Sequence, residues 1–361
     1  MTRRPRLAIT LGDPCGIGPE LLVRTIGEVS GWADPIVVGS RSGLELLEVH
    51  AERPADWAWG PVEPPFPGVP GEASRWAVRP RGSAAEILPA SEVLWLDPTP
   101  EVKASGLHLG EGSAASGTAT VRAIEVAAQL ALAGRVDALV TLPMAKSAAH
   151  LAGYSIPGHT EFLRDLSSVP RTCMAFLSPR LSVALHTVHQ SLRSVIEELQ
   201  AQAVADTLSF ASRHFARWTG ISRPRVALCA LNPHAGEAGA FGHEEHELRE
   251  ALEIAQAAWP EACFSGPHPS DSLFFRAVQG EFDLVVALYH DQGLIPIKVL
   301  EPDRAVNVTL GLPFIRTSPD HGTAFDKAGR WIARPANFLE AAAMAARFAR
   351  IRIDAAEGGS R

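Results

Sequence analysis

The sequence predicts an α/β fold with a largely parallel sheet. Short apolar runs of strand length alternate with longer segments of helical periodicity. Several of the apolar runs are unbroken, which is typical of strands buried on both faces of a parallel sheet. Polar residues gather directly after these runs, in loops rich in Gly and Pro. Strand–helix alternation of this kind favours a parallel sheet with helices on both faces.

The elements follow in order along the chain. Strands are expected at residues 6–10, 35–40, 136–143, 173–178, 181–188, 225–231, 283–290 and 305–311. Helices are expected at residues 20–29, 115–134, 192–216, 244–259 and 335–351. Between residues 52 and 100, Pro, Gly and Trp accumulate and no period holds. This stretch is therefore expected to be a surface excursion.

The composition limits the classes of protein to which this chain can belong. The 361 residues are 46% hydrophobic and 20% charged, which is ordinary for a globular chain and long enough for two lobes. A net charge of −7 gives no basic footprint for nucleic acid, and no run approaches the ~18 apolar residues of a membrane span. The four cysteines lack metal-ligand spacing, which favours reduced thiols in a cytoplasmic protein.

Three of the 13 histidines stand apart from the rest. His189, His234 and His290 each follow a separate apolar strand at its carboxyl end. Three imidazoles that converge there would hold a divalent metal with positions open for substrate, and the metal would polarise a substrate hydroxyl. The alternative is three unrelated loop histidines.

His186 lies close to His189 in the same loop, "HTVHQSL". In a helical turn both side chains could share one face, whereas in an extended segment they would point to opposite faces. We take His189 as the ligand.

Two cations lie in apolar, Gly-rich surroundings. Lys298 ends "YHDQGLIPIK", and Arg316 lies in "LPFIRTS". Each alone could be a solvated surface charge. A charge in an apolar environment is costly unless it is paired, and a phosphate or carboxylate would offset that cost.

The loop "GDPCGIGPE" at residues 12–20 contains G-x-x-G-x-G but not the Rossmann fingerprint. It is interpreted as a tight Gly-Pro turn that packs close to the active cleft. No P-loop motif occurs in the chain.

Six ordered motifs and the spacing between them coincide with those of a known family. They are "TLGDPCGIGPE", "TLPMAK", "GHTE", "LNPHAGEAGAFGHEE", "YHDQGL", "NVTLGLPFIRTSPDHGTA" and the spacing between them. With them the chain resembles the 4-hydroxythreonine-4-phosphate dehydrogenases, enzymes of pyridoxal phosphate synthesis. The resemblance runs from about Leu7 to Ala342 and leaves out the Pro-rich excursion.

The resemblance implies a two-lobed fold like that of isocitrate and isopropylmalate dehydrogenases, with the active cleft between the lobes. Residues 1–150 would form part of the first lobe and 151–310 the second, and residues 311–361 would return to the first. It also implies a homodimer with the active site at its interface.

The resemblance assigns site residues by position. The metal ligands fall on His189, His234 and His290. The substrate residues fall on His159, Thr160, Asp271, Lys298, Asn307 and Arg316. Asp291, beside His290, lines the same site, and either Lys298 or Asp291 would act as the general base.

"SPDHGTAFDKAGRWIARP" carries a second, wider resemblance, to the adenosine loop of the β-decarboxylating dehydrogenases. On it His321 and Gly322 would meet the adenine, and Asp326 would lie near the ribose. Without the resemblance, His321 could equally be a loop-capping histidine.

The expected activity is NAD-dependent oxidation of 4-phosphooxy-L-threonine, followed by decarboxylation to 3-amino-2-oxopropyl phosphate. One divalent metal ion, Zn, Mg, Co or Mn, would assist it. The loop "PSDS" stands where family members often have "PADT", so the exact substrate stays open. Relatives act on 4-phospho-D-threonate, 4-phospho-D-erythronate or a cis-diol. A ligand-binding protein without catalysis is the further alternative.

Overall fold

A computed structural model describes residues 3–51, 53–62, 68, 70–80 and 91–358. The chain divides into two compact units. Unit 1 contains residues 1–170 and 312–361, and unit 2 contains residues 171–311. No helix in the described ranges is both long enough and apolar enough to cross a membrane.

Unit 1 is built on a mainly parallel sheet in the order β13-β6-β1-β2-β5-β4-β3. The five strands from β13 to β5 run parallel, and β4 and β3 continue the sheet antiparallel. The strands are β1 (Arg6–Thr10), β2 (Asp34–Val38), β3 (Ala55–Gly60), β4 (Glu72–Pro80), β5 (Ser91–Asp97), β6 (Ala138–Thr141) and β13 (Ile315–Pro319). The unbroken apolar run of β6 is fully buried, as the sequence predicts for a central parallel strand.

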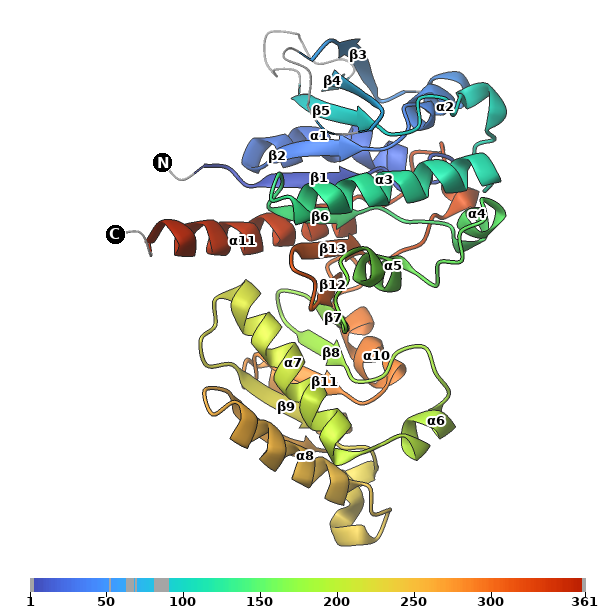
Figure 1. The fold of residues 1–361 in the computed structure, drawn as a ribbon. Coiled ribbons are helices and arrows are strands. Elements are labelled where there is room, and N and C mark those ends of the chain that lie inside the picture. The colour runs from blue at the N-terminus through green and yellow to red at the C-terminus, as the bar shows by residue number, and fades with distance from the viewer. Residues whose placement is uncertain (1–2, 52, 63–67, 69, 81–90, 359–361) are drawn as a thin grey trace. The chain divides into compact units, whose positions relative to one another are not determined.

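Helices cover this sheet (Figure 1). Alternate residues of β1 and β2, such as Ala8 and Val38, pack against the buried face of α3 (Ala114–Leu132). Helices α1 (Gly18–Trp32) and α11 (Ala336–Gly358) pack against each other. The shorter helices of the unit are α2 (Ser42–His50), α4 (Lys146–Leu151) and α5 (His159–Leu166).

The prediction of a surface excursion between residues 52 and 100 was wrong for the described part of that stretch. Strands β3, β4 and β5 form a meander that extends the sheet. Trp59, Trp76 and Trp95 pack together on it, with ring centroids 5.1–6.3 Å apart. The three rings supply an apolar core. It was not predicted because the irregular spacing of Pro and Gly obscures the alternation typical of strands. Residues 52, 63–67, 69 and 81–90 of the stretch lie outside the described residues.

The strands of unit 2 lie in the order β10-β9-β11-β8-β7-β12. The first four strands are parallel, and β7 and β12 are antiparallel to their neighbours. The strands are β7 (Cys173–Leu177), β8 (Ser182–Leu185), β9 (Arg225–Cys229), β10 (Cys263–His268), β11 (Leu284–Ala287) and β12 (Val306–Leu310). The strand pairing in both units confirms the α/β class with a largely parallel sheet.

Helices also flank the sheet of unit 2. Helices α7 (Ala201–Thr219) and α8 (Glu245–Ala258) lie side by side (Figure 1). Helices α9 (Ser270–Val278) and α10 (His290–Leu300) pack through Leu273 and Ile297 onto a core cluster that includes Val183 of β8 and Val285 of β11.

The single helix predicted at residues 192–216 is two helices. Helix α6 (Leu192–Glu197) ends before an extended Gln200, and α7 begins at Ala201. A carboxylate oxygen of Glu247, on α8, accepts a hydrogen bond from the amide of Ala201 at 2.9 Å. This cap comes from a helix distant in the sequence, so helical periodicity alone cannot place the break.

The sequence analysis placed the first boundary near residue 150, whereas unit 1 extends to residue 170. Helix α5 accounts for the difference, because its Leu163 is buried in the core cluster of α3.

The loop 12–20 forms a tight turn between β1 and α1. Gly12 has a φ of 73°, and an added Cβ would lie 2.5 Å from the carbonyl oxygen of Pro143. Asp13 is 1% exposed, and its carboxylate accepts hydrogen bonds from the amide of Cys15 and the hydroxyl of Ser116. Through Asp13 the turn is therefore hydrogen-bonded to the first turn of α3.

Two helical glycines give a matched test of the packing in unit 1. At Gly117 of α3, a Cβ would lie 2.0 Å from the carbonyl oxygen of Ala148 on α4, whereas at Gly31 of α1 nothing lies within 4 Å. We predict that Gly117→Ala lowers the free energy of unfolding by about 1–3 kcal/mol, because overpacking outweighs the better helix propensity of alanine. Gly31→Ala should raise it by up to about 1 kcal/mol. Urea denaturation measures both changes, and equal effects would contradict the close approach of α3 and α4.

Candidate functional site

The predicted metal histidines follow three neighbouring strands of unit 2. His189 lies four residues beyond β8, His234 five residues beyond β9, and His290 begins the helix after β11. Strand β11 lies between β8 and β9, and all three strands are parallel. Their carboxyl ends therefore share one edge of the sheet, where ligands bind in open α/β folds.

The structure brings His189 and His290 together. Their ring centroids are 5.9 Å apart. Two imidazoles that bind one ion at about 2.1 Å have ring centres about 5–6 Å apart, so this pair fits a shared metal. Nδ1 of His290 lies 2.7 Å from a carboxylate oxygen of Asp291. This contact leaves Nε2 as the ring nitrogen for a metal, which is the usual arrangement of a carboxylate-oriented histidine ligand.

His234 does not join this pair within the described chain. It begins a run of left-handed residues from 234 to 238, within the segment Pro233–Gly239. Buried Glu245 holds the start of this loop, because its carboxylate accepts hydrogen bonds from the backbone amide and side chain of Asn232. Across the residues that the structure describes, no group of three or more His, Cys, Asp or Glu is placed to hold a metal ion.

His186 has a structural role, as the choice of His189 requires. Its Nδ1 lies 2.8 Å from the hydroxyl of Thr207, which also accepts a hydrogen bond from Arg171 at 2.5 Å. Burial, and then the charge of Arg171, lower the pKa of His186 to about 4. His186 is thus held against α7, while His189 is exposed.

The other predicted residues of unit 2 lie near the same strands. Asp271 is exposed in the first turn of α9, directly after β10. Asn307 of β12 pairs with Phe176 of β7, and Nζ of Lys298 lies 5.9 Å from the centroid of the Phe176 ring. Asn307 and Lys298 therefore both neighbour one aromatic side chain.

Unit 1 contains a buried cation on strand β13. Arg316 of β13 is 3% exposed, and its Nε and Nη2 donate hydrogen bonds to the hydroxyl of Thr141 on β6 at 3.1 and 2.7 Å. Burial lowers the pKa of Arg316 to about 10, which leaves the guanidinium charged at neutral pH. Thr141 is the last residue of β6, so the charge sits at the carboxyl edge of this sheet.

His159 lies beside Arg316, at the start of α5. Burial, then the charges of Arg316 and Lys146, lower its pKa from 6.5 to about 3. Nε2 of His159 is buried and has no hydrogen-bond partner in the described structure. Thr160 follows in the first turn of the same helix. A guanidinium beside a neutral imidazole whose free ring nitrogen can carry the proton can bind a phosphate or carboxylate by donating hydrogen bonds to it.

The predicted adenosine loop follows β13. Nδ1 of His321 lies 3.2 Å from the carbonyl oxygen of Gly322, while Nε2 is buried and lacks a partner among the described residues. A Cβ on Gly322 would meet nothing within 4 Å, so this backbone is open. Asp326 is exposed in the short helix Phe325–Lys327. The orphaned ring nitrogen and the open backbone fit a polar ring such as adenine.

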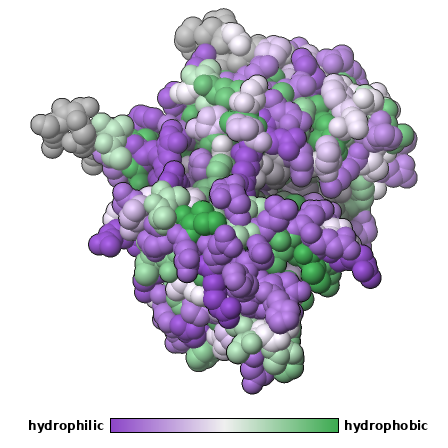
Figure 2. Space-filling view, turned by 60° about the horizontal axis from the view of Figure 1, so that its bottom comes forward, coloured by the Kyte–Doolittle hydropathy of each residue, from purple (hydrophilic) through white to green (hydrophobic). Residues whose placement is uncertain are grey.

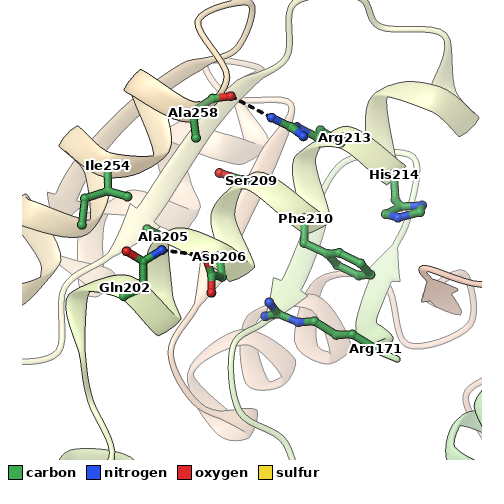
Figure 3. A pocket seen from close by; sticks show the side chains of 10 residues that line it. All are labelled: Arg171, Gln202, Ala205, Asp206, Ser209, Phe210, Arg213, His214, Ile254 and Ala258. Carbon is green, nitrogen blue, oxygen red and sulfur yellow. Dashed lines mark hydrogen bonds between the residues drawn. The ribbon is translucent and has the colours of Figure 1, made fainter. Parts of the chain in front are cut away.

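A separate pocket of about 480 Å³ lies between α7 and α8 (Figure 3). Two hydrogen bonds link residues of its lining: Arg213 donates to the carbonyl oxygen of Ala258, and Asp206 accepts from Gln202. None of the predicted site residues lines it. On the face seen in Figure 2, hydrophobic residues form small patches within a mostly hydrophilic surface.

The family described as "Pyridoxal phosphate biosynthetic protein PdxA" matches residues 33–345 of this chain. The chain belongs to the PdxA family. A 4-hydroxythreonine-4-phosphate dehydrogenase of Desulfosudis oleivorans is 40% identical over 335 residues, which cover 91% of each chain. A D-threonate 4-phosphate dehydrogenase of Cupriavidus necator is also 40% identical, over 93% of this chain and 95% of the relative.

Solved structures agree with this assignment. A 4-hydroxythreonine-4-phosphate dehydrogenase from Klebsiella pneumoniae has a TM-score of 0.78 at 34% identity and covers 96% of this chain and 99% of its own. A terephthalate 1,2-cis-dihydrodiol dehydrogenase from Burkholderia xenovorans has a TM-score of 0.62 at 25% identity, with 96% and 98% coverage.

The three histidines, Lys298 and Arg316 can be proposed from residue type and position alone, but several residues around Arg316 and His159 cannot. Thr141 and Lys146 lie in "TLPMAK", directly after a buried strand, and this position is the signal that could have pointed to them. The negative charge of Glu161 in "GHTE" acts on Arg316 and supports its protonated form.

The depressed pKa of His159 predicts a pH dependence of stability. Below about pH 6.5 the unfolded chain protonates this imidazole, whereas the folded protein keeps it neutral until about pH 3. The free energy of unfolding should therefore fall as the pH drops through this window. In His159→Gln the fall between pH 7 and pH 4 should be smaller by roughly 1–3 kcal/mol. Urea denaturation measures it, with pH 8 as the baseline; identical pH profiles would contradict a neutral His159.

Proposed function

We propose that this chain is an NAD-dependent and divalent-metal-dependent dehydrogenase that oxidises 4-phosphooxy-L-threonine. The product loses carbon dioxide to give 3-amino-2-oxopropyl phosphate. The observation that carries the proposal is the buried Arg316 beside a neutral His159, in a chain of the PdxA family. The overall charge of −7 gives a dianion no general attraction, so a local pocket has to bind the phosphate.

When bound, NAD supplies the hydride acceptor and a divalent metal supplies a Lewis acid for the substrate hydroxyl and the carbonyl that it becomes. His189, His290 and His234 would hold the metal. Arg316, His159 and Thr160 bind the phosphate end of the substrate and orient the reacting carbon, while Asp271 and Asn307 contact the remainder. Orientation of this kind lowers the entropic part of the barrier.

The reaction also needs a base. Lys298 or Asp291 accepts the hydroxyl proton, and Asp291 is the partner of His290 at 2.7 Å. Loss of carbon dioxide from the resulting β-keto acid leaves negative charge on the former carbonyl oxygen, where nearby positive charge stabilises it.

His321, Gly322 and Asp326 would bind the adenosine part of NAD. A carboxylate at the ribose repels the 2′-phosphate of NADP, so Asp326 favours NAD. Arg334, eight residues further along the chain, would weaken this preference.

A homodimer completes the site in this proposal. Two observations support it. Only two of the three imidazoles come together within the described part of one chain. Helices α9 and α10 also present Phe275, Ile295 and Val299 with exposed fractions of 69%, 60% and 76%. An apolar patch of this kind in a globular protein marks an interaction surface. A second copy of the chain would cover it and bring the third imidazole to the metal.

A second candidate substrate is 4-phospho-D-threonate. The D-threonate 4-phosphate dehydrogenase of Cupriavidus necator matches this chain at the same 40% identity as the relative named for hydroxythreonine phosphate. Both substrates carry a terminal phosphate, so the pocket of Arg316 and His159 suits either. Turnover with each substrate separates the two activities.

A monomeric variant tests whether a second subunit completes the metal site. We predict that Phe275→Asp, on α9, yields monomers because it places a charge in the apolar patch. These monomers should lose most of their bound zinc although His189, His234 and His290 are unchanged. Sedimentation velocity gives the oligomeric state, and atomic absorption gives the metal content.

Val49→Asp is the matched control for this experiment. Val49 is 75% exposed on α2 of unit 1, so this variant should remain dimeric and keep its metal. A Phe275→Asp monomer with full metal content would show that one chain forms the whole metal site.

The phosphate pocket predicts a substrate-dependent loss of activity. Arg316→Ala should lower kcat/KM for the phosphorylated substrate by roughly 10- to 150-fold, because a charge-assisted contact typically contributes about 1.5–3 kcal/mol. The loss should be much smaller for the dephosphorylated acid.

Arg164→Ala is the control for the Arg316 variant. Arg164 is a partly exposed guanidinium on α5, paired with Asp165 at 2.8 Å, and its removal should leave kcat/KM nearly unchanged. If the unaltered enzyme used the dephosphorylated acid as efficiently as the phosphorylated one, the pocket would not be a phosphate site.

A further inference from the structure

A buried carboxylate on α1 holds the far end of the adenosine loop. Glu20 is 0% exposed and lies in the first turn of α1. Its Oε2 accepts hydrogen bonds from the backbone amides of Gly329 and Trp331 at 3.1 and 3.3 Å, and its Oε1 accepts one from Ala333 at 3.2 Å. Three amides of one five-residue segment thus converge on one carboxylate. A buried carboxylate persists only with such partners.

Arg24, one helical turn later, holds the carbonyl groups of the same segment. Its Nη1 donates to the carbonyl oxygen of Ala333 at 2.5 Å and to that of Trp331 at 3.4 Å. Glu20 therefore accepts from the amides of Gly329, Trp331 and Ala333. Arg24 donates to the carbonyl groups of the last two. The two side chains are four residues apart, so they project from the same face of the helix.

The segment needs this support because its backbone is strained. Trp331 has a φ of 57°, in the left-handed region that a bulky side chain rarely adopts. Such a residue persists only where its surroundings fix it, and strained positions concentrate at functional sites. The amide of Trp331 is one of the three amides that donate hydrogen bonds to Glu20. The carboxylate thus acts directly on the strained residue.

The same segment closes the loop that begins at His321. The other end of the loop is tied to the turn before α1, where the amide of Ile17 donates to the carbonyl oxygen of Thr323 at 3.1 Å. Two ring nitrogens of the loop, Nε2 of His321 and Nε1 of Trp331, are buried without a partner in the described structure. Polar atoms left in this way indicate that a ligand supplies their partners.

We propose that Glu20 and Arg24 are positioning residues that fix residues 329–333 in the conformation that binds the dinucleotide, and that they thereby set the affinity for NAD. The inference rests on the proposed NAD-dependent function. A loop that is already ordered binds more tightly, because binding does not have to bear the cost of ordering it. The two residues act through the loop, so the chemical step should not depend on them.

Calorimetric titration of the enzyme with NAD, in the absence of substrate, tests the inference. Glu20→Gln keeps the shape of the side chain but removes the charge and one acceptor oxygen. The Kd for NAD should rise roughly 10-fold, a typical effect of weakening charge-assisted hydrogen bonds. The kcat at saturating NAD and the KM for the phosphorylated substrate should stay within about twofold of the unaltered enzyme. Hydrogen exchange at Trp331 and Ala333 should accelerate in the nucleotide-free protein.

Asp97→Asn is the matched control. Asp97 is a 3%-exposed carboxylate of the same unit that also accepts two backbone amides, those of Arg41 and Thr99, at 2.9 Å. It has no hydrogen bond to the loop among the contacts described. A general loss of stability from removing a buried carboxylate should appear in this variant as well, whereas a loss of NAD affinity should not.

A rescue experiment separates positioning from a merely structural role. Trp331→Gly removes the strain at φ 57°, because glycine adopts this conformation freely. In the Trp331→Gly background, Glu20→Gln should therefore raise the Kd for NAD by less than it does when Trp331 is present, each variant being compared with its own parent. Arg24→Met is a second variant at an exposed residue, for the case in which Glu20→Gln does not fold, and should raise the Kd roughly threefold.

The outcomes are distinct. If the unaltered enzyme bound neither NAD nor NADP, the proposed function would fail and the inference with it. If it bound NAD and folded Glu20→Gln or Arg24→Met bound equally well, the inference alone would be overturned. An equal loss of affinity in Asp97→Asn would also overturn it.

Discussion

A buried, permanently charged side chain on β13 is the main constraint on the candidate site of unit 1. Arg316 lies on β13, 3% exposed, with Thr141 of β6 as its neutral hydrogen-bond partner. An arginine charge in such a place is costly unless an anion or a network of polar groups surrounds it. The parallel pairing of β13 with β6 fixes the guanidinium at the carboxyl edge of the sheet. His159 remains neutral because it is buried and because that charge is close. The fold thus holds a buried positive charge beside a neutral imidazole.

The constraint in unit 2 is geometric. Three parallel strands end at one edge, and each is followed by a histidine. Adjacent strands lie about 4.8 Å apart, so imidazoles that follow adjacent strands can come close together, as His189 and His290 do. His234 follows the strand on the other side of β11, so a longer reach separates it from His189. The proposed site shared between two subunits would remove the need for one chain to cover that distance.

The parallel strands could be predicted because unbroken apolar runs such as residues 138–141 mark buried parallel strands. The candidate site residues could be proposed because they follow such runs directly, where ligands bind in open α/β folds. The meander of residues 55–97 was missed because its core is three tryptophans brought together by strand pairing, not by spacing. The break at Gln200 was missed because Glu247, which caps α7, lies on another helix. Glu20 was missed because its three partners lie more than 300 residues away. In each case a contact distant in the sequence decides the local structure.

The most direct test of the account is the product balance with a pure substrate. Purified enzyme with a divalent metal and NAD should convert 4-phosphooxy-L-threonine with one carbon dioxide released for each NADH formed, and 4-phospho-D-threonate is assayed in parallel. NADH and carbon dioxide in equal amounts from at least one of these phosphorylated acids, with metal required, is the result that the account predicts. No NADH from either acid, with the metal bound and the protein folded, would contradict it.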